Sequence, residues 1–317
     1  MNKTKPAPKN RTIFLSEDEI KEFSGNLITL KQKSAVNTII NKTINQDLFE
    51  ILDLLPDEFI DLLFVDPPYN MNKEFGSVKF REMNADRYSE WIDSFISKLV
   101  RCLKPHASIY FCGDWKSSNS IQEVLQRHFV IRNRITWERE KGRGSKKNWK
   151  NNSEDIWYCT NSDKPVFNAK SVQLKRRVLA PYRKENGLPK DWVETSKGGF
   201  RLTYPSNLWT DISVPFWSMA ENTAHPTQKP EKLLAKIILA STDENHVIFD
   251  PFLGSGTTSV AAKKLRRKYV GVEIEKEYAC LAEKRLKMAE NDEKIQGFRD
   301  GVFWERNTFN GKNNKNK

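Results

Sequence analysis

The stretch Leu62–Tyr69 carries an apolar run that ends in residues able to do chemistry: Asp66, Pro67, Pro68 and Tyr69. The run lacks polar alternation and is rich in β-favouring residues, which predicts a buried strand. Each proline fixes its own φ and lacks an N–H for a sheet, so the strand must stop there. Open α/β sheets bind their ligands at the carboxyl ends of strands. We therefore interpret this stiff turn as a reaction centre, in which the carboxylate acts as a general base or as a hydrogen-bond acceptor.

A glycine-containing stretch, residues 250–256 (Asp-Pro-Phe-Leu-Gly-Ser-Gly), follows a second apolar strand pattern. Strand, glycine loop, helix, strand and acid is the order of a nucleoside-binding βαβ unit, and Glu273 stands at the expected spacing after Gly254 to accept ribose hydroxyls. The loop lacks the third glycine of a dinucleotide fingerprint and the Gly-Lys-Ser/Thr of a P-loop. It therefore favours a nucleoside with a short charged tail over a pyrophosphate, and a simple tight turn is the structural alternative.

Two basic segments could contact a polyanion. Residues 141–150 carry five cations, no acid, two glycines and a tryptophan. Residues 165–222 break the α/β rhythm and mix cations with aromatic rings, which suits phosphate contact and argues against disorder. A solvated loop and a structural cover with a charged face are the alternatives. The net charge of +12 and the pI of about 9.4 favour nucleic acid as the partner.

Alternating strand and helix patterns must position these groups, and they predict a mostly parallel sheet with helices on both faces. Strand patterns lie at residues 44–47, 62–65, 108–112, 130–137, 155–160, 247–249 and 269–272, and helix patterns at 48–55, 88–103, 121–128, 233–239 and 278–288. Pro105 should stop the helix that begins at Tyr88. Residues 71–85 are predicted to form a mobile loop over the site, and Asp47 is either a ligand or a helix cap.

Length and composition exclude several classes of protein. The 317 residues suit one large α/β domain with an insertion. No stretch is apolar enough to span a membrane, and residues 1–11 lack a signal-peptide core. The cysteines form no CxxC pair and have no His cluster near them, so we expect free thiols in a reducing cytoplasm and no metal. They are Cys102, Cys112, Cys159 and Cys280.

Taken together, three motifs resemble the DNA amino-methyltransferases of restriction–modification systems, in the β arrangement where the catalytic motif precedes the cofactor motif. They are Asp66-Pro67-Pro68-Tyr69, His225-Pro226-Thr227-Gln228-Lys229-Pro230 and the glycine loop at 250–256. The likeness covers residues 44–288. It implies an α/β fold with a doubly wound, mostly parallel seven-stranded Rossmann-like sheet, an irregular target-recognition insertion, and S-adenosylmethionine as the cofactor. One departure is Asn152-Ser153-Glu154-Asp155-Ile156, where relatives often carry a His-Glu pair before the strand, which puts in doubt any base contact assigned there but not the chemistry.

The resemblance also assigns site residues by position. The catalytic turn would be Asp66, Pro67, Pro68 and Tyr69. The cofactor would be held by Asp47, Asp66, His225, Thr227, Lys229, Asp250, Phe252, Gly254, Ser255, Gly256 and Glu273, with Glu273 at the ribose and His225, Thr227 and Lys229 near the methionine end. DNA contacts are expected from Lys141, Arg143, Lys146, Lys147, Lys175, Arg176, Arg177 and Arg183.

The implied reaction is methylation of an exocyclic amine on a base flipped out of DNA. The Asp66 carboxylate and the Pro67 carbonyl would accept the amine hydrogens and free the nitrogen lone pair, while Tyr69 would stack on the base. Aspartate at position 66 favours adenine N6 over cytosine N4, because the family's cytosine-N4 enzymes usually carry serine there. The chain contains no Pro-Cys dipeptide, which argues against methylation of a cytosine ring carbon.

Alternative functions keep the fold and change the substrate or the activity. They are a cytosine-N4 enzyme, an RNA adenine or protein amide methyltransferase (typically with Asn in place of Asp66), and an inactive DNA-binding relative. The missing third glycine disfavours a nicotinamide dehydrogenase.

We predict five segments: an N-terminal tail and helix (1–40), a catalytic half (41–164), a target-recognition insertion (165–222), a cofactor-binding half (223–305) and a disordered basic tail (306–317). The expected partners are double-stranded DNA and a cognate restriction endonuclease acting on the same site. We expect a bacterial cytoplasmic location, at the nucleoid when the protein is bound to DNA. Monomer and homodimer are equally open.

Overall fold

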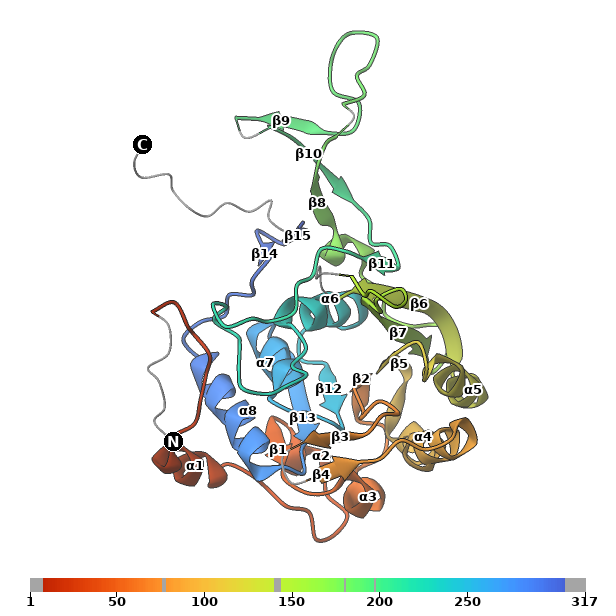
Figure 1. Ribbon diagram of the computed structural model, residues 1–317, viewed down its shortest axis with the longest axis vertical. Helices are drawn as coiled ribbons and strands as arrows, with labels where there is room; N and C mark the ends of the chain where they lie inside the picture. Colours follow the sequence, from red (N-terminus) through yellow and green to blue (C-terminus); the bar gives the residue numbers. More distant parts are fainter. Residues whose placement is uncertain (1–7, 76–77, 140–143, 180, 197, 306–317) are drawn as a thin grey trace.

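A computed structural model describes residues 8–75, 78–139, 144–179, 181–196 and 198–305. Its centre is an eight-stranded sheet, which Figure 1 shows in the lower part of the molecule. In spatial order its strands are β1 (Lys42–Ile44), β13 (Lys268–Val272), β12 (Val247–Asp250), β2 (Ile60–Val65), β5 (Leu103–Gly113), β7 (Ser153–Thr160), β6 (Val130–Glu138) and β11 (Leu208–Trp209).

Neighbouring strands pair in parallel, except that β7 runs antiparallel to both β5 and β6. The predicted mostly parallel α/β sheet is therefore confirmed. The two-residue β11 adds one strand to the seven expected, because Leu208 and Trp209 pair with Thr136 and Trp137 of β6. Its position at the edge of the sheet lets so short a segment pair without changing the core.

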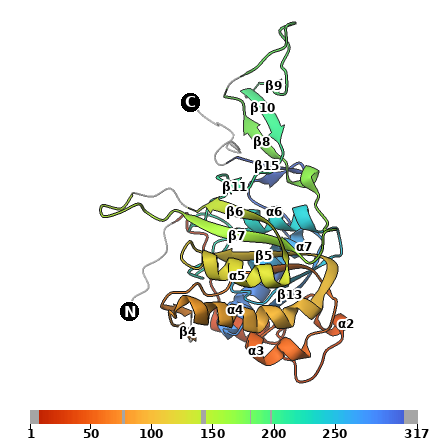
Figure 2. The same ribbon diagram turned by 90° about the vertical axis from the view of Figure 1, so that its right-hand side faces the viewer.

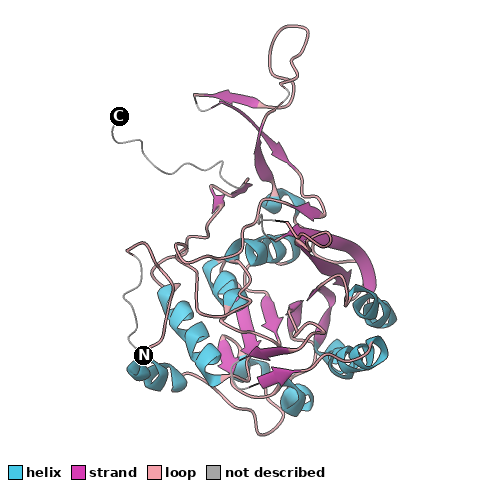
Figure 3. Cartoon of the chain, in the orientation of Figure 1, coloured by secondary structure: helices cyan, strands magenta, loops and turns pink. Residues whose placement is uncertain are grey.

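Helices cover both faces of this sheet (Figure 3). One core packs Leu63 and Val65 of β2 against α3 (Leu48–Ile51), α4 (Ala85–Leu99) and α5 (Ser118–His128). The opposite core packs Leu62 and Phe64 against α6 (Glu231–Ser241), α7 (Thr257–Lys264) and α8 (Lys276–Met288). Successive side chains of a strand point to opposite faces, so a strand buried on both sides must be apolar throughout. This explains the unbroken apolar run that precedes Asp66.

Local boundaries differ from the sequence prediction where tertiary pairing overrides the local pattern. The helix α4 ends at Leu99 and a 3₁₀ turn, η2 (Val100–Cys102), follows it, so Pro105 does not stop the helix and lies inside β5. The register between β2 and β5 shifts where Pro105 lies, so its missing N–H costs no ladder hydrogen bond. The predicted mobile loop at 71–85 contains a hairpin, β3 (Lys73–Phe75) and β4 (Val78–Phe80).

Other short elements also depart from the predicted bounds. The strand β1 ends at Ile44, so Asp47 lies beyond it and caps α3 instead. That helix ends at Ile51, and a second 3₁₀ turn, η1 (Leu52–Leu54), completes the predicted helical stretch. The N-terminal helix α1 (Glu17–Ser24) begins at a capping box, in which the Ser16 side chain accepts the Glu19 N–H and the Glu19 side chain accepts the Ser16 N–H.

A second sheet projects from the body, as Figure 2 shows at the top. Its strands, in spatial order, are β14 (Phe298–Arg299), β15 (Val302–Trp304), β8 (Leu174–Arg177), β10 (Gly198–Thr203) and β9 (Val193–Thr195). We name it the outer sheet. Phe303 of β15 is fully buried and packs with Val172 and Leu174 of the insertion and with Ala235 of α6; the 3₁₀ turn η3 (Ala169–Val172) precedes β8. The insertion expected to be irregular is thus ordered, partly by strands from the far end of the chain.

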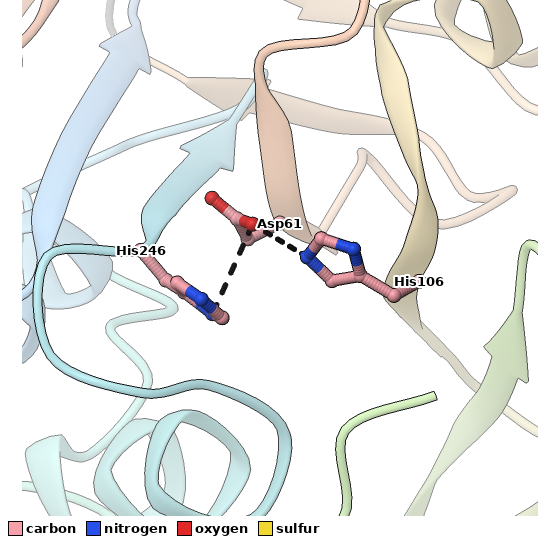
Figure 4. Close-up of side chains that lie close together, drawn as sticks. All are labelled: Asp61, His106 and His246. Carbon is pink, nitrogen blue, oxygen red and sulfur yellow. Dashed lines mark hydrogen bonds and ion pairs between the residues drawn. The ribbon is translucent and has the colours of Figure 1, made fainter. Parts of the chain in front are cut away.

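A cluster of Asp61, His106 and His246 lies at the amino ends of β2, β5 and β12, away from the predicted site (Figure 4). His106 Nε2 lies 2.8 Å and His246 Nδ1 3.8 Å from Asp61 Oδ1. The Lys104 ammonium already binds both carboxylate oxygens at 2.9 and 3.0 Å, and the Val247 N–H donates to Oδ2 at 2.8 Å. A metal would have to displace this ammonium, so we assign the cluster to holding three strands together.

All four cysteines are free thiols, as predicted, and the structure also buries each of them. Within the described part of the chain, no helix combines the length and the apolar character that crossing a membrane requires.

Candidate active site

A cavity of about 330 Å³ opens where the carboxyl ends of β2, β12 and β13 meet. Parallel neighbouring strands bring their carboxyl ends to one edge, which is why residues far apart in the sequence gather there. The predicted site residues on its lining are Asp47, Asp66, Pro67, Pro68, Tyr69, His225, Thr227, Lys229, Asp250, Phe252, Gly254, Ser255 and Glu273. The lining does not include Gly256, which packs against Ala282 of α8.

The turn after β2 is fixed on both sides by hydrogen bonds. The Tyr88 hydroxyl of α4 donates to the Pro68 carbonyl at 3.1 Å. The Asn70 side chain donates to the Met83 carbonyl at 2.7 Å and accepts from the Met83 N–H at 2.8 Å. The partners in these contacts, Met83 and Tyr88, lie outside the turn in the sequence. They keep Asp66 and Tyr69 at the cavity.

Lys229 forms an ion pair with Asp66. Its ammonium lies 2.6 and 2.7 Å from the two carboxylate oxygens, and the side chain is only 8% exposed. The resemblance places Lys229 near the cofactor's methionine end, whereas its ammonium here binds the first residue of the catalytic turn. Burial by itself lowers the pKa of Lys229, but the charges of Asp66 and Glu154 outweigh it and raise the pKa above its usual value. Lys229 is therefore a cation.

Glu154 joins the same group of side chains, although the sequence predicts no catalytic or binding role for it. It is the second residue of β7, its side chain is 4% exposed, and Oε2 lies 3.4 Å from the Lys229 ammonium. The Arg139 guanidinium binds Oε1 at 2.9 Å. A carboxylate at the start of an apolar strand was the available signal, but its partners come from three other segments. The spacing of Glu154 and its partners in the sequence therefore does not indicate that they are in contact.

The Tyr69 hydroxyl lies between the two carboxylates. It is 3.1 Å from Asp66 Oδ1 and 3.2 Å from Glu154 Oε2, and it lies 3.3 Å from the Lys229 ammonium. Burial, together with the charges of Asp66 and Glu154, raises the pKa of Tyr69 well above its usual value. The hydroxyl is therefore protonated and has one hydrogen to donate to either carboxylate.

The glycine loop lies across the cavity from this turn. Gly254 has φ +54°, and its N–H donates to Glu273 Oε2 at 2.7 Å. Gly256 has φ +85°, and a Cβ there would lie 2.5 Å from the Ala282 Cβ of α8. Glycine is needed at both positions for backbone conformation, and at Gly256 also for close helix packing. The loop therefore leaves its backbone open to a ligand at Gly254 while Gly256 brings α7 against α8.

Two buried carboxyls flank the loop. Burial raises the pKa of Asp250 and of Glu273 to about 7 each. Glu273 accepts the Glu275 N–H at 2.8 Å, and Asp250 accepts the Phe252 N–H at 3.0 Å. A carboxyl with a pKa near neutrality can donate as well as accept a hydrogen bond, which suits hydroxyl ligands such as those of a ribose.

His225, Thr227 and Asp47 complete the lining. Burial and the charge of Lys229 lower the pKa of His225 to about 4, so its ring is neutral. The ring packs edge-on against Tyr278 at 4.5 Å, and its Nδ1 accepts the Thr227 N–H at 3.3 Å. The Asp47 carboxylate accepts the Phe49 N–H at 3.0 Å as the cap of α3 while also lining the cavity. The position of Asp47 is thus compatible with both predicted roles, a ligand of the cofactor and the cap of a helix.

The lining divides into an apolar part and a polar part, as a nucleoside requires. Phe49, Trp91 and Phe252 supply aromatic surface for a base, and Glu273 supplies a hydroxyl partner. The volume lies at the lower end of ligand pockets, which span roughly 300–1,000 Å³. The donor set therefore fits a nucleoside with a short polar tail.

The predicted DNA-binding residues fall into two groups outside the cavity. Lys141 and Arg143 lie outside the described residues. Lys146 and Lys147 are exposed on the loop between β6 and β7, which extends to the left in Figure 2. The others, Lys175, Arg176, Arg177 and Arg183, belong to the outer-sheet region.

Several outer-sheet cations already have partners within the protein. The Lys175 ammonium lies 4.5 Å from the Trp304 ring centre, and Arg176 lies 3.5 Å from Glu305. Arg183 stacks on Trp192 at 4.9 Å and lies 3.6 Å from Glu194. These side chains therefore also stabilise the outer sheet.

Comparison with known proteins finds relatives that match most of this chain. The family model for N6/N4 methyltransferases, described as DNA methylase, matches residues 60–284. Type II methyltransferase M.HpaI of Haemophilus parainfluenzae is 31% identical over 260 residues, covering 81% of this chain and 76% of that protein. DNA adenine methyltransferase YhdJ of Escherichia coli (strain K12) is 32% identical over 255 residues, covering 78% of this chain and 82% of that protein.

Solved structures agree with the fold. The M1.HpyAVI–SAM complex superposes with a TM-score of 0.52 at 24% identity, covering 77% of this chain and 98% of that one. The cytosine-N4-specific PvuII DNA methyltransferase gives 0.55 at 21% identity, covering 79% and 91%. At these identities the likeness concerns the fold.

Proposed function

This chain belongs to the DNA methylase family, and from that premise we propose that it is a site-specific DNA methyltransferase acting on the exocyclic N6 of a flipped-out adenine in double-stranded DNA. The methyl donor is S-adenosylmethionine. The observation that carries the proposal is the single cavity that joins the Asp66–Tyr69 turn to the Gly254 loop and Glu273. A methyl donor and an acceptor base must meet in one site, and this cavity has chemistry suited to each.

The cofactor-binding part of the cavity is assigned from its donor set. Glu273 receives the ribose hydroxyls, and Phe252 and Trp91 provide surface for the adenine ring. His225, Thr227 and Asp47 lie beside the polar tail. We assign Lys229 to the catalytic turn, because its ammonium is held by Asp66 and Glu154. When bound, S-adenosylmethionine supplies an electrophilic sulfonium methyl group.

The protein itself positions and polarises the target amine. An exocyclic amine is a poor nucleophile because its lone pair is delocalised into the ring. Acceptance of its hydrogens by the Asp66 carboxylate and the Pro67 carbonyl localises that lone pair, and the two prolines keep both acceptors in place. The Tyr69 ring stacks on the flipped base. Catalysis on this account is positioning and electrostatics, without a covalent intermediate.

Adenine is favoured over cytosine by two observations. Position 66 carries aspartate, and the relative from Escherichia coli at 32% identity is named a DNA adenine methyltransferase. The likeness to the cytosine-N4 enzyme is at 21% identity and concerns the fold. Type II relatives from bacteria further support a restriction endonuclease partner acting on the same site and a bacterial cytoplasmic location at the nucleoid.

Asp66→Ala tests the catalytic assignment. The variant should bind S-adenosylmethionine, but methyl transfer should fall by about 100- to 1,000-fold, the usual cost of removing one preorganised electrostatic partner. Tritiated-methyl transfer to genomic DNA measures the rate, and calorimetry measures the cofactor. Asp53→Ala, which breaks an exposed ion pair with Lys98, is the matched control and should be fully active. Normal transfer by Asp66→Ala would end the assignment, and sequencing of modified bases distinguishes adenine N6 from cytosine N4.

A further inference from the structure

The Lys229 ammonium stands between two buried carboxylates. It lies 2.6 and 2.7 Å from the oxygens of Asp66 and 3.4 Å from Glu154 Oε2. An N⁺–H···O⁻ hydrogen bond is usually about 2.7–2.9 Å long. Lys229 is therefore hydrogen-bonded to Asp66, and Glu154 Oε2 lies about 0.6 Å beyond the usual hydrogen-bond length from its ammonium.

The position of Lys229 conflicts with the role of Asp66. Asp66 is a stronger acceptor for the target amine when its carboxylate is not already paired with a cation. In this arrangement Lys229 donates to both oxygens, and its positive charge weakens the carboxylate as an acceptor for a neutral amine. Release of Lys229 before or as the amine arrives would therefore strengthen Asp66 as an acceptor. A buried ammonium needs another anion to move to.

Glu154 meets that requirement. Its side chain is 4% exposed, and the Arg139 guanidinium holds the other oxygen, Oε1, at 2.9 Å. That contact anchors the carboxylate while leaving Oε2 directed at Lys229 and Tyr69. Lys229 and Arg139, with Lys73 nearby, face the two carboxylates, so Lys229 can change partner and still be paired with a buried anion.

The Tyr69 hydroxyl allows both arrangements to be hydrogen-bonded. It carries one hydrogen and lies 3.1 Å from Asp66 Oδ1 and 3.2 Å from Glu154 Oε2. While Lys229 binds Asp66, Tyr69 donates to Glu154. Once Lys229 binds Glu154, Tyr69 donates to Asp66 Oδ1, and Oδ2 is free for the amine. Each carboxylate keeps a donor in both states, so the exchange has no large hydrogen-bonding cost.

We propose that Glu154 is a positioning residue that takes Lys229 from Asp66 when the target amine enters, and thereby frees Asp66 as an acceptor. This inference rests on the proposed methyl transfer. Glu154 acts through Lys229 and Tyr69 and makes no contact with the reacting atoms. No bond is formed or broken and no proton is transferred in the exchange.

Single-turnover rates in a double-mutant cycle test this coupling. Glu154→Gln should slow methyl transfer by about 10- to 100-fold, the range expected when a reacting group is held off its productive geometry, while the affinity for S-adenosylmethionine stays unchanged. With Lys229→Met already present, Glu154→Gln should add less than about a twofold loss, because Asp66 is no longer blocked. Glu154→Asp retains the charge and should recover part of the rate.

The control is Glu123→Gln, the same substitution in an exposed ion pair with Arg127 on α5, which should leave every rate unchanged. Independent, multiplicative effects of the Glu154 and Lys229 substitutions would overturn the inference, because Glu154 would then affect the rate by a route that does not include Lys229. Loss of cofactor affinity in Glu154→Gln would overturn it as well.

A crystal structure of Asp66→Asn tests the exchange without relying on activity. With the charge at position 66 removed, the Lys229 ammonium should lie about 2.8 Å from Glu154 Oε2. An ammonium still bound at position 66, or turned to the carboxylate of added S-adenosylmethionine, would overturn the inference. A wild-type protein that transfers no methyl group to DNA would refute the proposed function, and this structural result would then still decide the exchange.

Discussion

Individual side chains in the cavity are coupled across long stretches of the sequence. Lys229 and Asp66 are separated by 163 positions and Tyr69 and Glu154 by 85, yet they share one group of hydrogen bonds. The Gly254 N–H and the Glu273 carboxylate are coupled in the same way across 19 positions. A substitution at any of these residues therefore removes a hydrogen bond to a residue from a distant segment of the chain.

Gly254→Trp should abolish cofactor binding. A Cβ at this position would lie 3.0 Å from His225 Nε2, φ is +54°, and the indole would fill the cavity. We expect the affinity for S-adenosylmethionine to fall by at least about 100-fold, equivalent to roughly 2.8 kcal/mol, as measured by calorimetry.

Gly301→Trp is the matched control, because Gly301 also has a positive φ (+73°) but a Cβ there meets open space. It should bind the cofactor normally. If Gly254→Trp bound the cofactor as tightly as this control, the loop would not be the binding site.

Among the secondary-structure elements, the two ends of the central sheet have different roles. The carboxyl ends of β2, β12 and β13 surround the cavity, and the amino ends of β2, β5 and β12 are joined by Asp61 and its cations (Figure 4). Burial alone would raise the pKa of Asp61, but hydrogen bonds from the Val247 N–H, Lys104 and His106 outweigh it and hold the pKa below its usual range. The carboxylate thus stabilises the edge opposite the site.

Asp61→Asn should therefore lower stability in a pH-dependent way. Because the pKa of Asp61 is lower in the folded state, its contribution is complete above the unfolded pKa of about 3.9 and is lost as the pH falls through the folded value. At neutral pH we expect a loss of roughly 2–4 kcal/mol in the free energy of unfolding, since the carboxylate is 1% exposed and holds several donors.

Urea unfolding at a series of pH values measures this, and the variant should show a flatter decline below about pH 4 than the wild type. Asp53→Asn removes the exposed partner of Lys98 and should leave the free energy of unfolding nearly unchanged. Equal losses in the free energy of unfolding for Asp61→Asn and Asp53→Asn would show that the Asp61 cluster stabilises the protein no more than an exposed ion pair does.

Over the full chain, the excess positive charge extends well beyond the cavity. The net charge is +12, and exposed cations occur both on the loop between β6 and β7 and on the outer sheet (Figure 2). The outer sheet combines strands of the insertion, for which the sequence predicts target recognition, with β14 and β15 from residues 298–304. Its ion pairs and stacked rings hold it in shape.

The double substitution Lys146→Ala/Lys147→Ala should weaken DNA binding equally for all sequences. If both lysines contact phosphates, the slope of log K against log salt should fall by up to about 1.8, and specificity should be unchanged. Fluorescence anisotropy at several salt concentrations measures both quantities.

Lys42→Ala/Lys268→Ala removes the same charge from the amino ends of β1 and β13, at the opposite edge of the sheet, and should leave the slope unchanged. Identical slopes for the two double variants would place DNA elsewhere on the protein.

The amino-acid sequence by itself determined the strand–turn motif at Asp66, the glycine loop with Glu273, the alternating α/β pattern and the likeness to a methyltransferase family. These are local features, because periodicity, proline and glycine act within a few residues. The partner of Lys229, the place of Glu154, the completion of the outer sheet by β15 and the Asp61 cluster were decided only by the tertiary structure. Each depends on strand order and register between distant segments, which local pattern does not encode. The same physical reason explains why Pro105 lies within a strand and why Glu154 was missed.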